Sequence, residues 1–141
     1  MDPLFVFFSN HPLLFAALGA VLVLLVLNEV AGNYLGVRKL SPPEAVRLIN
    51  DRDALVVDLR PVADYKRGHI LNAVNIPAAK LTEKITEYSK TRDKPIVLVC
   101  ALGGQATQGA EQLRKAGYTE AFPLRGGIND WLGASLPVTA S

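Results

Sequence analysis

An uninterrupted apolar run near the N-terminus constrains this chain more than any other feature. Residues 13–27 read LLFAALGAVLVLLVL, and every one of them is apolar or glycine. A bilayer core takes about 20 mostly apolar helical residues, and residues 13–31 approach that length. A helix without a polar face would otherwise need protein on all sides, which a remaining domain of roughly 100 residues can hardly provide. The run therefore predicts one transmembrane helix.

A cleaved secretory signal is the sharper alternative for the same run. Its length suits a long h-region, and Val30-Ala31-Gly32 resembles a weak cleavage site. However, no Lys or Arg precedes the run and Asp2 is acidic, which argues against a signal peptide. Residues 4–8 are also apolar, so we expect contact with the membrane through residues 4–31.

Basic residues divide the chain into two parts. Residues 1–37 contain no Lys or Arg, whereas Arg38 and Lys39 closely follow the apolar segment. The positive-inside rule then predicts a single-pass protein whose C-terminal domain faces the cytoplasm. A lone cysteine, unable to form an internal disulfide, fits that reducing compartment. We expect an anchor with a short tether at 32–36, together spanning 1–36, and one domain over 37–141.

Composition and motifs exclude several functions for that domain. All 15 Lys and Arg residues lie in this domain, interspersed with 11 Asp and Glu residues, which is typical of a solvated surface and not of a nucleic-acid-binding face. One cysteine and two distant histidines, His11 and His69, lack the spacing of a zinc site. The glycine motifs of nucleotide-binding loops do not occur. We expect no metal, no cofactor and no nucleic acid.

Short strand-like and helix-like patterns alternate after the tether, which predicts an α/β domain with a central parallel sheet. Ser41 and Glu44 form a capping box that starts a helix. Apolar runs at 54–58 and 96–100 read as buried strands, and they end in Asp58 and Cys100, where a parallel sheet presents its sites. Further strands are expected at 74–76 and 121–124, and helices around 81–88, 106–116 and 131.

Cys100 is the candidate nucleophile. It ends a strand and precedes a loop with two glycines, Gly103 and Gly104, and then a helix expected from Ala106. Backbone amides and the positive end of the helix dipole stabilise a thiolate in such a position. A lone cysteine is also often a small buried apolar residue at a strand end, and this alternative stays open from spacing alone.

Separate motifs in this domain resemble the rhodanese (sulfurtransferase) family. Residues 58–77, DLRPVADYKRGHILNAVNIP, are similar to its first signature, and residues 122–131, FPLRGGINDW, to its C-terminal signature. Cys100 lies between them, and the resemblance covers about residues 39–138. It implies a rhodanese-like α/β fold, a central parallel sheet flanked by helices, here preceded by one transmembrane helix.

The resemblance also implies the chemistry. Cys100 would be catalytic and would carry a sulfane sulfur as a persulfide, from thiosulfate or a persulfide donor to cyanide or a thiol acceptor. The loop would bind the persulfide and the donor through the backbone amides of Ala101, Leu102, Gly103, Gly104, Gln105 and Ala106. Asp58, Arg60 and His69 match supporting positions of the family, either in the site or as a structural polar network. Gly126-Gly127 is expected to serve turn geometry.

The cysteine loop departs from the family pattern in its charge. Family members commonly carry Arg or Lys where Ala101 and Gln105 stand, and a hydroxyl residue at Ala106. A neutral loop binds dianionic thiosulfate less well, which favours a protein or low-molecular-weight persulfide as donor. Phosphatase or arsenate-reductase chemistry needs an Arg clamp, and residues 101–112 contain none. The alternative function is a catalytically weak or inactive, membrane-tethered binding or sulfur-carrier module.

Overall fold

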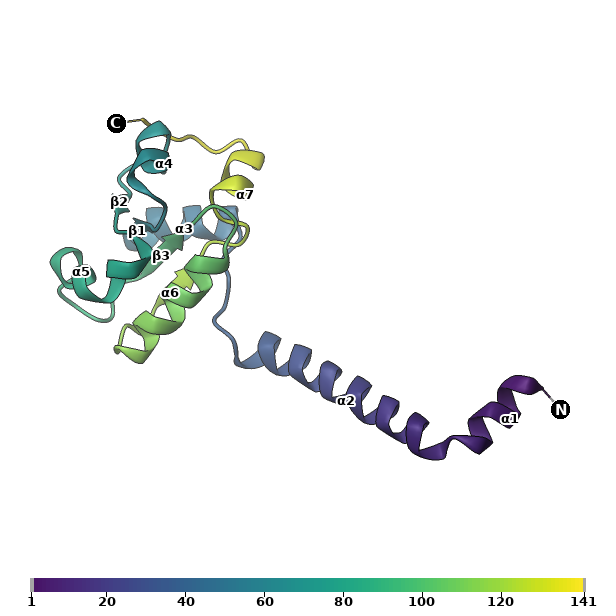
Figure 1. Ribbon diagram of the computed structural model, residues 1–141. Helices are drawn as coiled ribbons and strands as arrows, with labels where there is room; N and C mark the ends of the chain where they lie inside the picture. The colour runs from purple at the N-terminus through teal and green to yellow at the C-terminus, as the bar shows by residue number, and fades with distance from the viewer. Residues whose placement is uncertain (1, 141) are drawn as a thin grey trace. The chain divides into compact units, whose positions relative to one another are not determined.

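The computed structural model describes residues 2–140, apart from the side chains of residues 32–35. Two compact units make up the chain, Met1–Gly36 and Val37–Ser141. The first is helical, and the second is an α/β domain (Figure 1).

The N-terminal unit consists of two helices, α1 (Pro3–Asn10) and α2 (Pro12–Leu35). Asp2 caps α1 by accepting a hydrogen bond of 3.1 Å from the amide of Leu4. Within α2, Pro12–Ala31 is a 20-residue segment of mean hydropathy 2.5 with none of it buried, long and apolar enough to cross a membrane.

The predicted tether at residues 32–36 is wrong over most of its length, because α2 continues to Leu35. Gly32 is the reason for the error. A single glycine inside a helix costs only about 1 kcal/mol relative to alanine, which an already long helix tolerates. The helix α1 was also not foreseen, since residues 4–8 suggested only additional apolar length.

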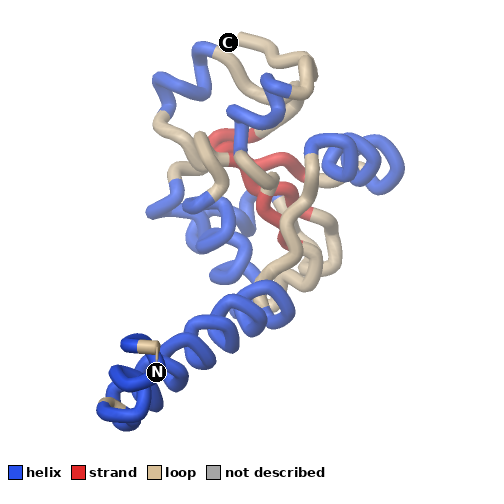
Figure 2. The backbone as a smooth tube through the Cα atoms, turned by 90° about the vertical axis from the view of Figure 1, so that its right-hand side faces the viewer, coloured by secondary structure: helices blue, strands red, loops and turns tan. Residues whose placement is uncertain are grey.

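A four-stranded parallel sheet forms the centre of the second unit, as predicted (Figure 2). Its strands are β1 (Leu55–Asp58), β2 (Val74–Asn75), β3 (Ile96–Val99) and β4 (Ala121–Pro123), in the order β2-β1-β3-β4. Asp58 at the end of β1 lies opposite Asn75 on one side and Val99 on the other. The last residues of these strands therefore share one edge of the sheet.

Helices cover both faces of the sheet (Figure 1). They are α3 (Pro42–Arg52), α4 (Val62–Arg67), α5 (Leu81–Tyr88), α6 (Gly104–Lys115) and α7 (Gly127–Gly133), with a short 3₁₀ turn, η1, at Ala78–Lys80. The helix α3 begins at the predicted capping box, in which Ser41 and Glu44 each bond to the other's backbone. The helix α4 was not predicted.

Side chains alternate between two buried clusters along the central strands. On β3, Ile96 and Leu98 pack with residues of α5 and α6, whereas Val97 and Val99 pack with residues of α3 and α7. Successive side chains of a strand point to opposite faces, so a strand covered on both sides is apolar throughout. Cys100 continues the first series and joins the α5–α6 cluster.

Candidate active site

Cys100 lies directly after β3 and its side chain is turned toward the start of α6. The residue is 2% exposed. Its Sγ accepts hydrogen bonds from the amide of Gly103 at 2.9 Å and from the amide of Ala106 at 3.4 Å. Two backbone donors on one sulfur form the arrangement that stabilises negative charge at that atom.

The loop reaches this geometry through Gly103. This residue is the N-cap of α6 and has a φ of 106°, a conformation that L side chains rarely adopt. A Cβ there would also lie 3.3 Å from the amide nitrogen of Gly126. Gly104 has open space around it, so only the first glycine of the pair is required by the fold.

The helix α6 begins at Gly104, two positions before the predicted start at Ala106. The amide of Ala106 consequently belongs to the first helical turn, where amides lack a carbonyl partner within the helix. Within the described loop, the amides of Ala101, Leu102, Gly104 and Gln105 make no hydrogen bond to the sulfur. Two of the six loop residues predicted to bind substrate thus touch Sγ directly.

The first turn of α7 holds the other side of the cysteine loop. The amide of Ile128 donates a hydrogen bond of 2.8 Å to the carbonyl oxygen of Cys100, and that of Asn129 donates one of 3.3 Å to Ala101. Gly127, at a φ of 60°, permits this approach, because a Cβ there would lie 2.2 Å from the Cys100 oxygen. Sequence reasoning missed this contact; its signal is the Gly126-Gly127 pair, predicted only as a turn.

Asp58 and Arg60 form a buried ion pair at the same edge of the sheet. Arg60 Nη2 donates to Asp58 Oδ2 at 2.8 Å and to the carbonyl oxygen of Gly68 at 2.6 Å. The two side chains are 1% and 11% exposed, for Asp58 and Arg60 respectively. Asn75 Nδ2 donates to the backbone oxygens of both residues, at 3.0 and 2.9 Å. This geometry ties the loop after β1 to β2 and to the end of α4.

His69 connects the C-terminal segment to the loop after β1. Its ring stacks on Tyr65 with centroids 3.8 Å apart, and its Nδ1 lies 2.8 Å from the Tyr65 carbonyl oxygen. The backbone of His69 exchanges two hydrogen bonds with Thr139. Burial of the Tyr65 phenol raises its pKa, with a smaller contribution from the Asp58 carboxylate.

A pocket of about 240 Å³ connects these supporting residues to α7. Its lining includes Arg60, Arg67, Ile128, Leu132 and Val138. Ile128 is the residue whose amide bonds to the Cys100 carbonyl oxygen. The structure thus gathers Asp58, Arg60 and the cysteine loop at one edge of the sheet, although in the described chain neither these two residues nor His69 hydrogen-bonds to the loop.

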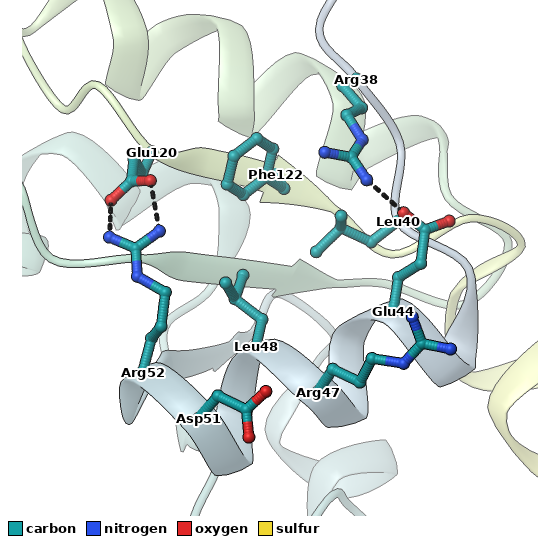
Figure 3. Close-up of a pocket in the computed structure, with 9 residues that line it drawn as sticks. All are labelled: Arg38, Leu40, Glu44, Arg47, Leu48, Asp51, Arg52, Glu120 and Phe122. Atoms are coloured by element: carbon teal, nitrogen blue, oxygen red, sulfur yellow. Dashed lines mark hydrogen bonds and ion pairs between the residues drawn. The ribbon is translucent and has the colours of Figure 1, made fainter.

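A separate groove of about 420 Å³ lies between α3 and β4 (Figure 3). None of its lining residues belongs to the cysteine loop. Leu48 and Phe122 form part of its floor, and charged pairs stand at its ends. Arg52 clamps Glu120 with two hydrogen bonds of 2.6 and 2.5 Å, which lower the pKa of that carboxyl group. Four of the charged residues that line the groove form two ion pairs, Arg38 with Glu44 and Arg52 with Glu120.

Comparisons with known proteins show which family has this fold. The chain is 35% identical over 139 residues to YibN of Escherichia coli (strain K12), a protein described as uncharacterized, with 98% of this chain and 97% of YibN covered. It is 33% identical over 96 residues to the thiosulfate sulfurtransferase GlpE of Coxiella burnetii, covering 67% and 86% of the two chains. The crystal structure of a rhodanese-related protein from Thermoplasma volcanium matches with a TM-score of 0.64 at 28% identity, covering 74% of this chain and 99% of that one.

A family model described as a rhodanese-like domain matches residues 41–134. The fold and the cysteine loop define an α/β domain of the sulfurtransferase superfamily. The chain belongs to the rhodanese-like domain family, which confirms the family and the fold class that the motifs at 58–77 and 122–131 indicated.

Proposed function

We propose that this protein is a thiosulfate sulfurtransferase-type (rhodanese-type) enzyme in which Cys100 is the nucleophile. The observation that carries the proposal is the position of Sγ, which accepts hydrogen bonds from the amides of Gly103 and Ala106 at the start of α6. Membership of the rhodanese-like family supports the same chemistry. The remaining loop residues, Ala101, Leu102, Gly104 and Gln105, surround the donor.

The reaction consists of two displacements at sulfur. In the first, the Cys100 thiolate attacks the outer sulfur of thiosulfate, the bond from that sulfur to the sulfite group breaks, and sulfite leaves with the electron pair. In the second, cyanide or a thiolate attacks the outer sulfur of the persulfide, and Cys100 leaves as a thiolate. No external oxidant is needed, because sulfane sulfur alone is transferred.

The uncharged loop makes a persulfide the better donor. Residues 101–106 carry no ionised side chain, so backbone amides supply the attraction for an anion. A dianion gains less from amides alone than from amides together with an Arg or Lys. We infer that thiosulfate is a poor donor and that a persulfide, which needs no sulfonate site, is a better one.

Intact mass spectrometry of the full chain in detergent tests the function. After incubation with a persulfide donor or thiosulfate, we expect the mass to rise by one sulfur atom and to return on addition of cyanide. Cys100→Ser is the control and should gain nothing. If the wild type gains no sulfur from any donor, the alternative of a membrane-tethered binding module replaces the enzyme.

We also propose that residues 1–36 anchor the domain at 37–141 to a membrane, through α2. The support is the 20-residue apolar segment Pro12–Ala31, of which nothing is buried. The absence of Lys and Arg before it, with Arg38 and Lys39 after it, favours a cytoplasmic position for the catalytic domain.

Cysteine labelling in a Cys100→Ser background tests this topology. Asp2→Cys should react with a membrane-impermeant maleimide in intact cells, whereas Glu111→Cys, on the exposed surface of α6, should react only after lysis. The reverse pattern contradicts the orientation. Release of the full chain by alkaline carbonate contradicts the anchor itself.

A further inference from the structure

Apolar side chains are exposed around the cysteine loop. Leu102, in the loop itself, is 75% exposed, and Leu132 of α7 is 52% exposed. Val138, in the segment after α7, is 38% exposed and lines the same pocket as Leu132. Single exposed leucines are ordinary on protein surfaces. These three lie in the cysteine loop, in the helix that binds this loop, and in the pocket that this helix lines, and their grouping calls for an explanation.

Backbone hydrogen bonds place Leu102 and Leu132 at the same edge of the domain. The amide of Asn129 donates to the carbonyl oxygen of Ala101, the residue before Leu102. Leu132 lies one turn further along α7 from Asn129. We call Leu102, Leu132 and Val138 the apolar rim.

The charges next to the rim are mixed in sign, because Arg125 and Asp130 are both exposed there beside two ion pairs. Arg60 pairs with Asp58 at 2.8 Å, and Arg67 pairs with Asp64 at 3.2 Å. The cysteine loop contributes no charge. A partner that carries a dense charge of one sign beside its reactive sulfur would find no surface of uniformly opposite charge here, whereas an uncharged apolar segment needs none.

The depth of the cysteine adds a constraint on shape. Cys100 is 2% exposed, so the second sulfur has to be delivered into the loop. A cysteine on a flat surface cannot do this, whereas a cysteine on a protruding segment can, while its neighbouring residues cover Leu102 and Leu132.

We propose that the rim docks a protein segment whose cysteine is flanked by apolar residues, and that this cysteine is the sulfur acceptor. The proposal rests on the sulfurtransferase function proposed above and specifies its acceptor. In the transfer, the acceptor thiolate attacks the outer sulfur of the Cys100 persulfide, whose proton stays on that sulfur. The new bond gives a persulfide on the acceptor, and Cys100 leaves as a thiolate.

Synthetic peptides of equal length, differing only in the residues on both sides of one cysteine, test the proposal. The full chain in detergent is first loaded with a small persulfide, and the rate of sulfur transfer to each peptide is measured per thiolate. Leucine-flanked peptide should be sulfurated about five- to tenfold faster than serine-flanked peptide, the effect of partly burying two leucine side chains. Aspartate- and lysine-flanked peptides should be no faster than the serine-flanked one.

The variant Leu132→Ser should reduce the leucine-to-serine rate ratio toward one. Tyr88→Ser is the matched control: Tyr88 is 43% exposed, ends α5 and does not line the pocket that Leu132 and Val138 share, so the ratio should persist. Because the readout is a ratio within one preparation, partial unfolding of a variant does not imitate the result.

The outcomes separate the docking proposal from the function on which it rests. A wild-type ratio of one, or a ratio that Leu132→Ser leaves unchanged, overturns the apolar rim while sulfur transfer stands. Fastest transfer to the aspartate-flanked peptide also overturns it and points instead to Arg125, an exposed cation next to Gly126. Failure to load Cys100 with any donor overturns both.

Discussion

The amide of Ile128 and the carbonyl oxygen of Cys100 are joined by a hydrogen bond of 2.8 Å, which connects the first turn of α7 to the peptide of the proposed nucleophile. With Asn129 holding the next carbonyl, the loop's oxygens face α7 while the amides of Gly103 and Ala106 face the sulfur. The loop is therefore fixed from two helices. The start of α6 supplies backbone donors to the sulfur. The first turn of α7 binds the loop's carbonyl oxygens, which keeps these acceptors away from the sulfur.

Gly127→Ala should disrupt this arrangement. The added Cβ would lie 2.2 Å from the Cys100 oxygen, at a residue with positive φ, so we expect a loss of about 2 kcal/mol or more in unfolding free energy. Persulfide formation on the folded fraction should slow about tenfold or more, since the loop must shift. Gly133→Ala, with nothing within 4 Å of its Cβ, is the control. Equal rates in the two variants would contradict the role of α7.

Gln105→Arg should improve the use of thiosulfate by placing a cation in the uncharged loop. We expect KM for thiosulfate to fall about threefold or more, as for a charge-assisted hydrogen bond, with a smaller change for a neutral persulfide donor. Steady-state kinetics with both donors check this. Gln112→Arg adds the same charge about two turns further along α6, at another exposed site, and should change little. An unaltered KM in Gln105→Arg would count against the electrostatic argument.

Asp58→Ala should destabilise the domain much more than Asp64→Ala. The first leaves the nearly buried guanidinium of Arg60 without its partner, which costs about 3–5 kcal/mol. The second removes a solvent-exposed pair with Arg67, whose side chains are 78% and 43% exposed, and costs about 0–1 kcal/mol. Urea unfolding of both variants measures the difference. Similar midpoints for the two would show that the Asp58–Arg60 pair is not structural.

Glu120→Gln should make the stability of the fold less sensitive to acid. The hydrogen bonds from Arg52 hold the pKa of Glu120 below its usual value of 4.5. Because the folded-state pKa is the lower one, the stabilisation is complete above the unfolded-state pKa and is lost as pH falls through the folded-state pKa. Thermal unfolding between pH 6 and 3 should show a smaller decrease in Glu120→Gln than in wild type. Glu111→Gln, which removes another glutamate charge, is the control. A decrease in Glu120→Gln as large as that in wild type would contradict the prediction.

Local sequence patterns were sufficient to predict most of the domain. The strand containing Leu98 is apolar throughout, and the strand containing Val57 is apolar up to its last residue, Asp58, because helices cover both faces. The capping box at Ser41 begins α3 where expected. The positions of Asp58 and Cys100 at one edge follow from parallel pairing, in which Asp58 lies opposite Val99. These features depend on residues close in sequence or on a general rule of topology.

Contacts between distant segments escaped prediction. The approach of α7 to Cys100 depends on a φ of 60° at Gly127 and on backbone hydrogen bonds, neither of which leaves a side-chain pattern. The start of α6 at Gly104 is set by the positive φ of Gly103, which glycine permits without requiring. The end of α2 was predicted too early, before Gly32, because glycine often ends a helix. Here the helix continues through Gly32 to Leu35.

The late position of α7 in the chain has a consequence for biosynthesis. Ribosomes make Cys100 before residues 126–129, so the nascent domain has this cysteine before it has the segment that fixes the loop. Parallel pairing of β3 with β4 must also wait for the same C-terminal stretch. The loop geometry around the thiol is thus completed only at the end of folding, and premature termination yields a cysteine without that geometry.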